Sequence, residues 1–429
     1  MKGRGCAAGL LACTLTLAAC GGGGSGGRSS TTQISGAKVL DANAPVKPGV
    51  IKFCSGKDTP GVAHDVVVRF NKRYASQGLT AKLVEFSPSA DEQRNQFVQR
   101  EQAKSGDCDV FSSDVVWTAE FASQKWLYDL TPYVQKRRAD FIPATLNTIH
   151  YAGKYWGVPL YSDAAFLYYN SSRVPQAPAT WQDVYRLAKS DGGIVYQGNA
   201  YEGLTCDFLE YSAAAGGKVL SPDGTKAVID SPQNLKALEL MVDGVRSGAA
   251  PHAVVTYTEE EARNAFESGK YAFMRNWTYA YALGQRAGSK VRNRLGVAPL
   301  PAWRGARAAA TLGGHNLVIS AFSNNPGGAL KLIDFMTSPA MEMVATARFS
   351  MASPLAATYG EPAVKKALPY AAELRTTIEN GVSRPVSPVY PQISQAIYKN
   401  VNAALAGQLS PQAALKNADA QINKALRTF

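Results

Sequence analysis

The feature that most constrains the fold is an alternation of short apolar strands and amphipathic helices that begins at Val50. Strand patterns occur at Val50–Cys54, Leu79–Phe86 and Cys108–Ser112, and helical spacing occurs at Val62–Ala75 and Ala90–Lys104. A strand–helix–strand–helix–strand order predicts a doubly wound α/β unit with a parallel sheet. Ligands of such sheets bind beyond the carboxyl ends of the strands. We therefore expect the loops that follow Cys54 and Phe111 to face one crevice.

The same alternation continues through the second part of the 429-residue chain. At about 100–200 residues per domain, this length suggests two domains, with three as the alternative. Further strands are expected at Ala165–Tyr169, Tyr271–Asn276, Gly296–Leu300 and His315–Ser320. Helices are expected at Trp181–Ala188, Tyr201–Ala215, Pro232–Ser247, Glu259–Glu267, Gly327–Met336, Ala340–Phe349, Tyr390–Leu405 and Pro411–Leu426. Thr180 and Thr258 are suited to cap two of these helices.

Charge and composition argue against several classes of protein. The net charge is +12, but the basic residues are scattered, the longest cluster is Lys136–Arg138, and no nucleic-acid motif is present. We expect no nucleic-acid partner, no metal and no cofactor, because four His residues and no Cys-x-x-Cys pair offer little for a metal site. Cys54, Cys108 and Cys206 allow one disulfide, and the alternative is that all three are small buried hydrophobic residues.

The amino-terminal residues are typical of an exported lipoprotein. Lys2 and Arg4 precede an apolar run, Ala7–Ala19, that is too short to span a bilayer. Leu17-Ala18-Ala19-Cys20 resembles the bacterial lipobox, which predicts a signal peptide over residues 1–19 and lipidation of Cys20 at the outer face of the cell membrane. The alternative is an ordinary secretion signal cut after Ala19. The Gly- and Ser-rich residues 20–48 suggest a flexible tether.

Several segments spread over Val50–Phe429 carry a family resemblance. They are Asp114–Phe121, Tyr155–Pro159, Leu167–Asn170, Tyr201–Leu204, Ala265–Ala272, Asn276–Trp277, Gly313–Gly314 and Arg384–Pro388. In order and spacing they resemble the family 1 extracellular solute-binding proteins of ABC importers, and most of all the lipid-anchored trehalose- and maltose-type disaccharide binders.

The resemblance implies a type II, maltose-binding-protein-like periplasmic-binding-protein fold. In that fold each of two lobes is a doubly wound sheet flanked by helices, and the chain crosses between the lobes three times. We place the crossings near residues 157–160, 300–303 and 350–352. Lobe 1 would hold residues 49–158 and 302–350, and lobe 2 residues 159–301 and 351–429.

The implied function is that of a monomeric receptor that closes around a disaccharide or short oligosaccharide. The closed form would dock on the transmembrane subunits of a permease, which are driven by a cytoplasmic ATPase. The sequence does not encode which sugar or linkage is bound.

The resemblance also implies a set of ligand-binding positions. They are Lys57, Asp58, Asp114, Asp163, Tyr201, Glu202, Trp277, Tyr279, Gly313, Gly314, His315 and Arg384, with Tyr281 as a weaker candidate. Aromatic faces suit the C–H faces of a sugar, while carboxylates and guanidinium groups suit its hydroxyls. His315 departs from the family pattern, in which an aromatic residue often follows the glycine pair.

Structural roles remain open for several of these residues. Asp114 could cap a helix over residues 115–122, Asp163 could cap a loop, and Glu202 could favour a helix dipole. Trp277, which we expect to begin a helix, could belong to the core. The glycine pair could serve a plain bend.

Two other functions remain as alternatives. Asp114, Asp163 and Glu202 could supply the carboxylate pair of a glycosidase, although the chain lacks a nucleophile elbow, a P-loop and a zinc motif. A surface adhesin or signalling receptor could reuse the fold. We expect a receptor and not an enzyme.

Overall fold

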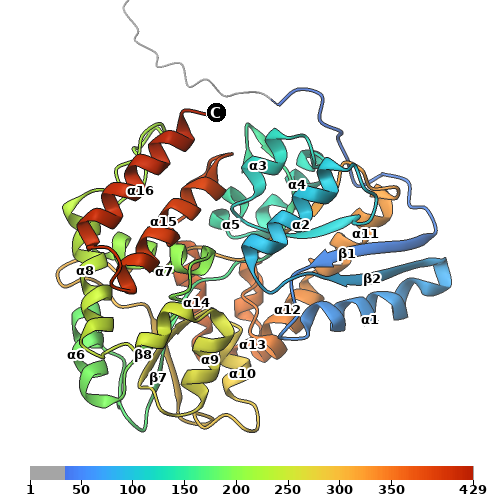
Figure 1. Cartoon of the computed structure of the whole chain (residues 1–429). Helices are drawn as coiled ribbons and strands as arrows, with labels where there is room; N and C mark the ends of the chain where they lie inside the picture. The colour runs from blue at the N-terminus through green and yellow to red at the C-terminus, as the bar shows by residue number, and fades with distance from the viewer. Residues whose placement is uncertain (1–33, 429) are drawn as a thin grey trace, which may run out of the picture. The chain divides into compact units, whose positions relative to one another are not determined.

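Two β-sheets organise the computed structural model, which describes residues 34–428 (Figure 1). The first sheet has the order β2-β1-β3-β11-β6. Its strands are β1 (Gly49–Ser55), β2 (Leu79–Glu85), β3 (Val110–Asp114), β6 (Val158–Tyr161) and β11 (His315–Ile319). β1 pairs in parallel with β2 and β3, as predicted, whereas β11 is antiparallel to β3 and β6. The first sheet is therefore mixed and not wholly parallel.

The second sheet has the order β10-β7-β9-β8 and is mostly antiparallel. Its strands are β7 (Phe166–Asn170), β8 (Ile194–Val195), β9 (Phe273–Asn276) and β10 (Leu295–Pro299). β7 is antiparallel to β9 and β10, and only the pair of β8 and β9 is parallel. We call the first sheet with its packed helices lobe 1 and the second sheet with its packed helices lobe 2.

The helices predicted from periodicity are present, most of them to within two residues at each end. The described residues also form several α-helices that the periodicity does not predict. The helices of the first half are α1 (Val62–Tyr74), α2 (Ala90–Gln102), α3 (Thr118–Ser123), α4 (Thr131–Arg137), α5 (Pro143–Asn147), α6 (Trp181–Asp191) and α7 (Glu202–Ala214). The remainder are α8 (Pro232–Arg246), α9 (Glu259–Glu267), α10 (Ala280–Gly284), α11 (Pro326–Met336), α12 (Pro339–Phe349), α13 (Pro362–Ala367), α14 (Ala371–Glu379), α15 (Tyr390–Leu405) and α16 (Pro411–Leu426). A small hairpin joins β4 (His150–Tyr151) to β5 (Lys154–Tyr155). None of the described helices is both long and apolar enough to serve as a membrane span.

Both predicted threonine caps are confirmed. The Thr180 hydroxyl accepts a hydrogen bond from the Asp183 backbone N–H at 3.2 Å, at the start of α6. At the start of α9, Thr258 and Glu261 form a reciprocal capping box. Such caps satisfy N–H groups that have no partner inside the helix.

Each lobe has its own apolar core. In lobe 1, Phe53, Val110 and Ile319 of the sheet are fully or almost fully buried against α1 and α11. In lobe 2, Tyr168 and Phe273 of the sheet are fully buried in a core that includes residues of α6, α7 and α15. Figure 1 shows α1 running alongside β2, and α15 running beside α16.

A disulfide joins Cys54, in β1, to Cys108, just before β3, with 5.8 Å between their Cα atoms. Cys206, on α7, is a buried free thiol. The sequence left open whether any of these cysteines would pair.

The structure differs from the expected tether over residues 34–48, which pack against lobe 1. Leu40 is buried, and its N–H donates to the Asp129 carbonyl at 3.0 Å. Asn325 donates from its side chain to the Lys47 carbonyl at 2.7 Å. Apolar residues and backbone pairing therefore make this stretch part of the folded body. The predicted signal peptide and Cys20 lie outside the described residues.

The connections between the sheets lie side by side. β6 extends to Tyr161 in the first sheet, so the first passage falls at residues 162–165 and not at 157–160 as predicted. The second lies within residues 300–314, between β10 and β11. The two segments pair with each other, because Asp163 and Gly313 exchange backbone hydrogen bonds of 3.1 and 2.8 Å. Near the expected third crossing, the Ala352 carbonyl accepts from the Ser162 N–H at 2.9 Å. The finer lobe boundaries stay a prediction.

Candidate functional site

A cavity of about 320 Å³ lies between the two lobes, where the connecting segments meet. All of the expected ligand-binding positions line it: Lys57, Asp58, Asp114, Asp163, Tyr201, Glu202, Trp277, Tyr279, Gly313, Gly314, His315 and Arg384. The weaker candidate Tyr281 is not part of the wall and packs against Tyr370, with 5.2 Å between ring centroids. The chain thus brings together residues that are far apart in sequence.

Arg384 joins two carboxylates of the wall. Its Nη1 lies 2.7 Å from Glu202 Oε1 and its Nη2 lies 2.7 Å from Asp114 Oδ1. Glu202 also accepts from the Tyr390 hydroxyl at 2.5 Å and the Ser394 hydroxyl at 2.5 Å. Burial raises the pKa of Glu202, and the Arg384 guanidinium opposes that rise. The Arg384 Nε, also buried, has no hydrogen-bond partner among the described residues.

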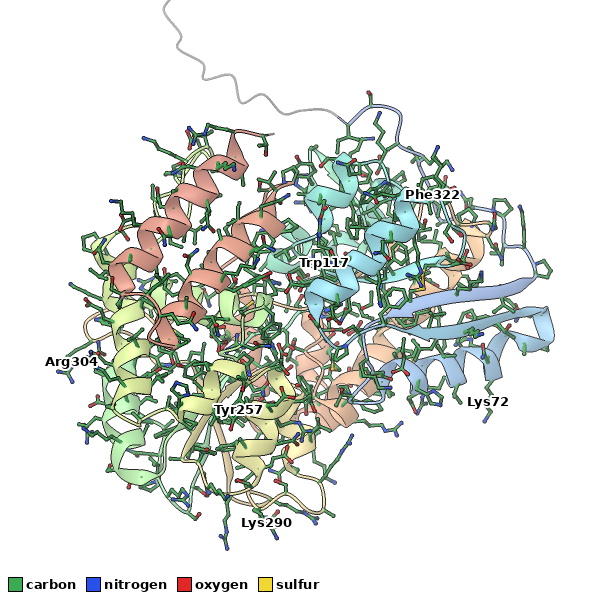
Figure 2. The ribbon with its side chains drawn as sticks, in the orientation of Figure 1. Lys72, Trp117, Tyr257, Lys290, Arg304 and Phe322 are labelled. Carbon is green, nitrogen blue, oxygen red and sulfur yellow. A yellow bond between two sulfur atoms is a disulfide. The ribbon has the colours of Figure 1, made fainter. Side chains whose placement is uncertain are left out.

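Asp114 does not cap a helix over residues 115–122. Its Oδ1 accepts from the Val116 N–H at 3.1 Å and so closes a short turn after β3. Helix α3 begins only at Thr118, with Trp117 as its N-cap residue. Trp117 packs edge-on to His315 at 6.4 Å between ring centroids and is labelled in Figure 2.

Asp163 connects the first passage to the loop after β9. Its Oδ1 accepts from the Thr278 hydroxyl at 2.6 Å, the Thr278 N–H at 3.1 Å and the Ala164 N–H at 3.1 Å. Burial raises the pKa of Asp163 to about 6, with the Thr278 hydrogen bonds opposing the rise. The carboxyl is therefore mainly ionised at neutral pH and can accept hydrogen bonds from a ligand.

The Trp277 ring is fixed by contacts with Arg275 and Glu259. The Arg275 guanidinium lies 4.1 Å from the ring centroid, and Arg275 is fully buried between Asp207 at 2.9 Å and Glu210 at 2.8 Å. The Trp277 indole N–H donates to Glu259 Oε1 at 3.4 Å. Trp277 precedes α10, which begins at Ala280, so it does not begin a helix as we expected. Its position in the cavity wall leaves it available for stacking.

The glycine pair is required by space and by backbone angle. A Cβ atom at Gly313 would lie 2.8 Å from the Trp277 ring. Gly314 has a φ of +105°, and a Cβ there would lie 2.2 Å from the Tyr161 carbonyl oxygen. Only glycine combines this φ with so close an approach.

His315, which follows the glycine pair, is neutral at pH 7 because burial lowers its pKa. Its Nδ1 lies 3.0 Å from the Ser112 hydroxyl, and its ring stacks on Tyr161 at 5.2 Å between centroids. These contacts fix the orientation of the imidazole in the cavity wall.

Lys57 and Asp58 line the cavity but use their polar atoms locally. Asp58 accepts from the Gly61 N–H at 3.0 Å and the His64 N–H at 2.8 Å at the start of α1. Lys57 Nζ lies 3.2 Å from Glu85. A role of these two residues in ligand binding stays a prediction.

Two acidic residues of the wall, Glu259 and Glu260, were missed by the sequence reasoning. Glu259 accepts from the Tyr201 hydroxyl at 2.6 Å, and Glu260 accepts from the Tyr279 hydroxyl at 2.7 Å. The sequence pattern there predicts only a helix over Glu259–Glu267 that begins after Thr258. The run of three glutamates at residues 259–261 was the available signal.

Asp91, on α2, was also missed. Its Oδ2 accepts from the Glu202 N–H at 3.0 Å, which joins lobe 1 to the start of α7 in lobe 2. Burial raises the pKa of Asp91, and the Glu202 N–H opposes that rise. This contact links the two lobes, and Asp91 itself does not line the cavity.

Within residues 34–428 no group of three or more His, Cys, Asp or Glu side chains is arranged to hold a metal ion. Two α/β lobes with an aromatic face, carboxylates and a guanidinium around one cavity define the class of two-lobed binding proteins. Comparison with known proteins gives the family: residues 67–343 match the bacterial extracellular solute-binding proteins, and the chain belongs to this family.

Individual relatives agree with this assignment. A Deinococcus radiodurans protein described as "Probable ABC transporter-binding protein" is 36% identical over 367 residues, which cover 80% of this chain and 86% of that protein. The maltose-bound MalE3 structure of T. maritima is 35% identical, with a TM-score of 0.83 over 88% of this chain and 99% of that one. A Thermotoga lettingae solute-binding protein with bound α-D-tagatose is 26% identical, with a TM-score of 0.81 over 88% of this chain and 99% of that one. These likenesses confirm the predicted two-lobed, maltose-binding-protein-like fold.

Proposed function

We propose that this protein is the sugar-binding component of an ABC importer and that its ligand is a disaccharide or short oligosaccharide of the maltose or trehalose type. The observation that carries the proposal is the cavity itself, where the Trp277 ring, the Asp163 carboxylate and the bridged set of Arg384, Glu202 and Asp114 converge. Groups suited to stacking and to hydroxyl recognition thus line one cavity. The relatives bound to maltose and to tagatose support a sugar as the ligand, and the maltose-bound relative supports a disaccharide.

The mechanism follows from the way the site is divided. Asp114 comes from lobe 1, whereas Trp277 and Glu202 come from lobe 2, so a bound sugar adds contacts between the lobes. A ligand that contacts both lobes stabilises the closed arrangement over an open one. The closed form would then dock on the transmembrane subunits of the permease. Compaction on adding sugar, measured by small-angle scattering, tests the closure.

The deciding experiment is calorimetry of maltose and trehalose binding to the wild type and to Trp277→Ala. Loss of a central aromatic contact should weaken binding by at least about 30-fold, or about 2 kcal/mol. Trp303→Ala is the matched control, because Trp303 is partly exposed and does not line the cavity. An affinity of Trp277→Ala equal to that of the wild type would remove this residue from the site.

The same samples separate the alternative functions. Sugar binding to a receptor raises the free energy of unfolding by about 2.7 kcal/mol when the sugar concentration is a hundred times Kd, and so raises the unfolding midpoint. A receptor also leaves the sugar chemically unchanged. A glycosidase would release monosaccharides, which chromatography detects. An adhesin or signalling protein would show neither the stabilisation nor the products.

A further inference from the structure

Part of the cavity wall is unsuited to a sugar. We name this part the apolar annex; it is formed by Phe53, Val66, Met336, Met341, Ala345 and Met351. These residues come from β1, α1, the end of α11, α12 and the segment after α12. The annex is therefore built within lobe 1, whose helices α1, α11 and α12 contact one another.

The annex is continuous with the polar part of the cavity, because its residues line the same space as Asp114, Trp277 and Arg384. Hydrocarbon and thioether groups offer a sugar hydroxyl no adequate partner, and burying a hydroxyl without a hydrogen bond is costly. A free disaccharide placed on the polar residues would leave the annex without a suitable occupant. An apolar group is the natural occupant of such a space.

The side chains of the annex also suit a variable occupant. Met336, Met341 and Met351 are all mostly buried, with exposed fractions of 4–6%. Methionine side chains are flexible and polarisable, so they adapt to aliphatic and aromatic groups alike.

A buried carboxyl group, that of Glu342, lies next to the annex in the cavity wall. Glu342, next to Met341 on α12, is only 2% exposed and lines the cavity. Burial raises the pKa of Glu342 to about 8, with a Ser353 hydrogen bond opposing the rise. Its carboxyl is thus mostly protonated at neutral pH and carries an O–H that can donate a hydrogen bond to an ether or ester oxygen.

We propose that the annex binds an apolar substituent attached to the sugar, so that the preferred ligand is a glycoside or ester with a short alkyl or aryl group and not the free disaccharide. The inference rests on the proposed function and extends it to a substrate class. The substituent would contact the methionines and Phe53, while its linking oxygen would lie within reach of Glu342.

The test is calorimetry with maltose and with its methyl, n-propyl, n-pentyl and phenyl glycosides in both anomeric forms. Burial of each methylene should lower Kd by about fourfold until the annex is full, in one anomeric series. In protein labelled with 13C at the methionine methyl groups, the phenyl glycoside should shift the NMR signals of Met341 and Met351 beyond the shifts that maltose causes. Neither measurement needs a variant to fold.

A variant then locates the effect. Ala345→Leu would fill the annex, and it should abolish the gain in affinity that the substituent gives over maltose, with both ligands measured on the same variant. Ala340→Leu is the matched control, since Ala340 lies on the same helix, is exposed and does not line the cavity. It should keep the full gain.

The outcomes separate the two ideas. If maltose binds but its Kd is not improved by any substituent in either anomeric series, the annex proposal is overturned and the sugar receptor stands. If Ala345→Leu keeps the whole gain, the substituent lies elsewhere and the annex proposal is likewise wrong. If neither maltose nor any maltoside binds, the maltose-type function fails and this inference fails with it.

Discussion

Replacing Arg384 should lower the stability of the folded protein, because Arg384 is the cationic partner of the two buried carboxylates that it joins, Glu202 and Asp114. In Arg384→Met the side chain keeps much of its length but loses both 2.7 Å contacts, to Glu202 and to Asp114. The side chains of the two acids are only 10% and 11% exposed, so each charge loses a partner that water cannot readily replace. Removing one member of a buried pair costs about 3–5 kcal/mol. The free energy of unfolding at neutral pH should fall by that amount.

The loss should depend on pH in a direction opposite to ordinary acid denaturation. Burial already raises the pKa of Glu202, and removing the guanidinium abolishes the main opposing effect. The folded variant then binds a proton at a pH where the unfolded chain does not. Stability therefore rises as the pH is lowered through the folded pKa of Glu202 and falls as the pH is raised. The variant should recover part of its deficit when the pH is lowered from neutral to about 5, just above the ordinary pKa of a glutamate, about 4.3.

Urea unfolding, followed by tryptophan fluorescence and by circular dichroism at both pH values, measures this deficit. Arg348→Met is the matched control, because the Arg348 side chain is 53% exposed and its pairing with Asp65 should be worth no more than about 1 kcal/mol. Adding Glu202→Gln to Arg384→Met should restore much of the stability by removing one unpaired charge. A deficit below about 1 kcal/mol, or one that grows on acidification, would refute the reasoning.

Three further changes have defined outcomes. Gly314→Ala should lower the unfolding free energy by more than about 1–2 kcal/mol and weaken sugar binding, because φ is +105° and the new Cβ would lie 2.2 Å from a carbonyl oxygen. Gly360→Ala is the control, since the space around Gly360 is open, and it should be nearly neutral in the same urea unfolding experiment. The double variant Cys54→Ser/Cys108→Ser should lose about 4 kcal/mol of unfolding free energy, since the disulfide spans 54 positions of chain. In thermal unfolding, the wild type with reductant should match the double variant, whose stability should not depend on reductant. Cys20→Ala, if the lipobox prediction holds, should move the protein from the membrane fraction to the soluble one without changing its sugar Kd.

Local patterns in the sequence predicted much of the fold. Helices such as α8 and α15 have an apolar face over several turns, and Thr180 and Thr258 mark two helix starts with capping chemistry. The short β8, of two residues, has too little pattern to be found. The antiparallel insertion of β11 beside β3 depends on pairing over about two hundred positions, which periodicity does not report.

The family resemblance pointed to single positions, such as Trp277, that the structure places in the cavity wall. It did not reveal contacts that depend on the tertiary structure. Asp91 accepts a hydrogen bond from the Glu202 N–H only because the two lobes, which carry α2 and α7, lie next to each other in the folded protein. The backbone hydrogen bond between Leu40 and Asp129 was not predicted, because the surrounding Gly- and Ser-rich sequence suggested a tether. Composition describes a segment on average, whereas a single apolar residue can anchor it.

The reciprocal backbone bonds between Asp163 and Gly313 have a consequence for how such a protein evolves. The same two residues belong to the connecting segments and to the cavity wall. Under the proposed closure, a substitution that adjusts the fit of a sugar there would also change the stiffness of the joint between the lobes. Selection for a new sugar would therefore find it difficult to alter affinity at this position without altering the rate of opening and release. Changes of specificity should accumulate instead on the far walls of the cavity, where a side chain can be exchanged while the joint keeps its mechanics.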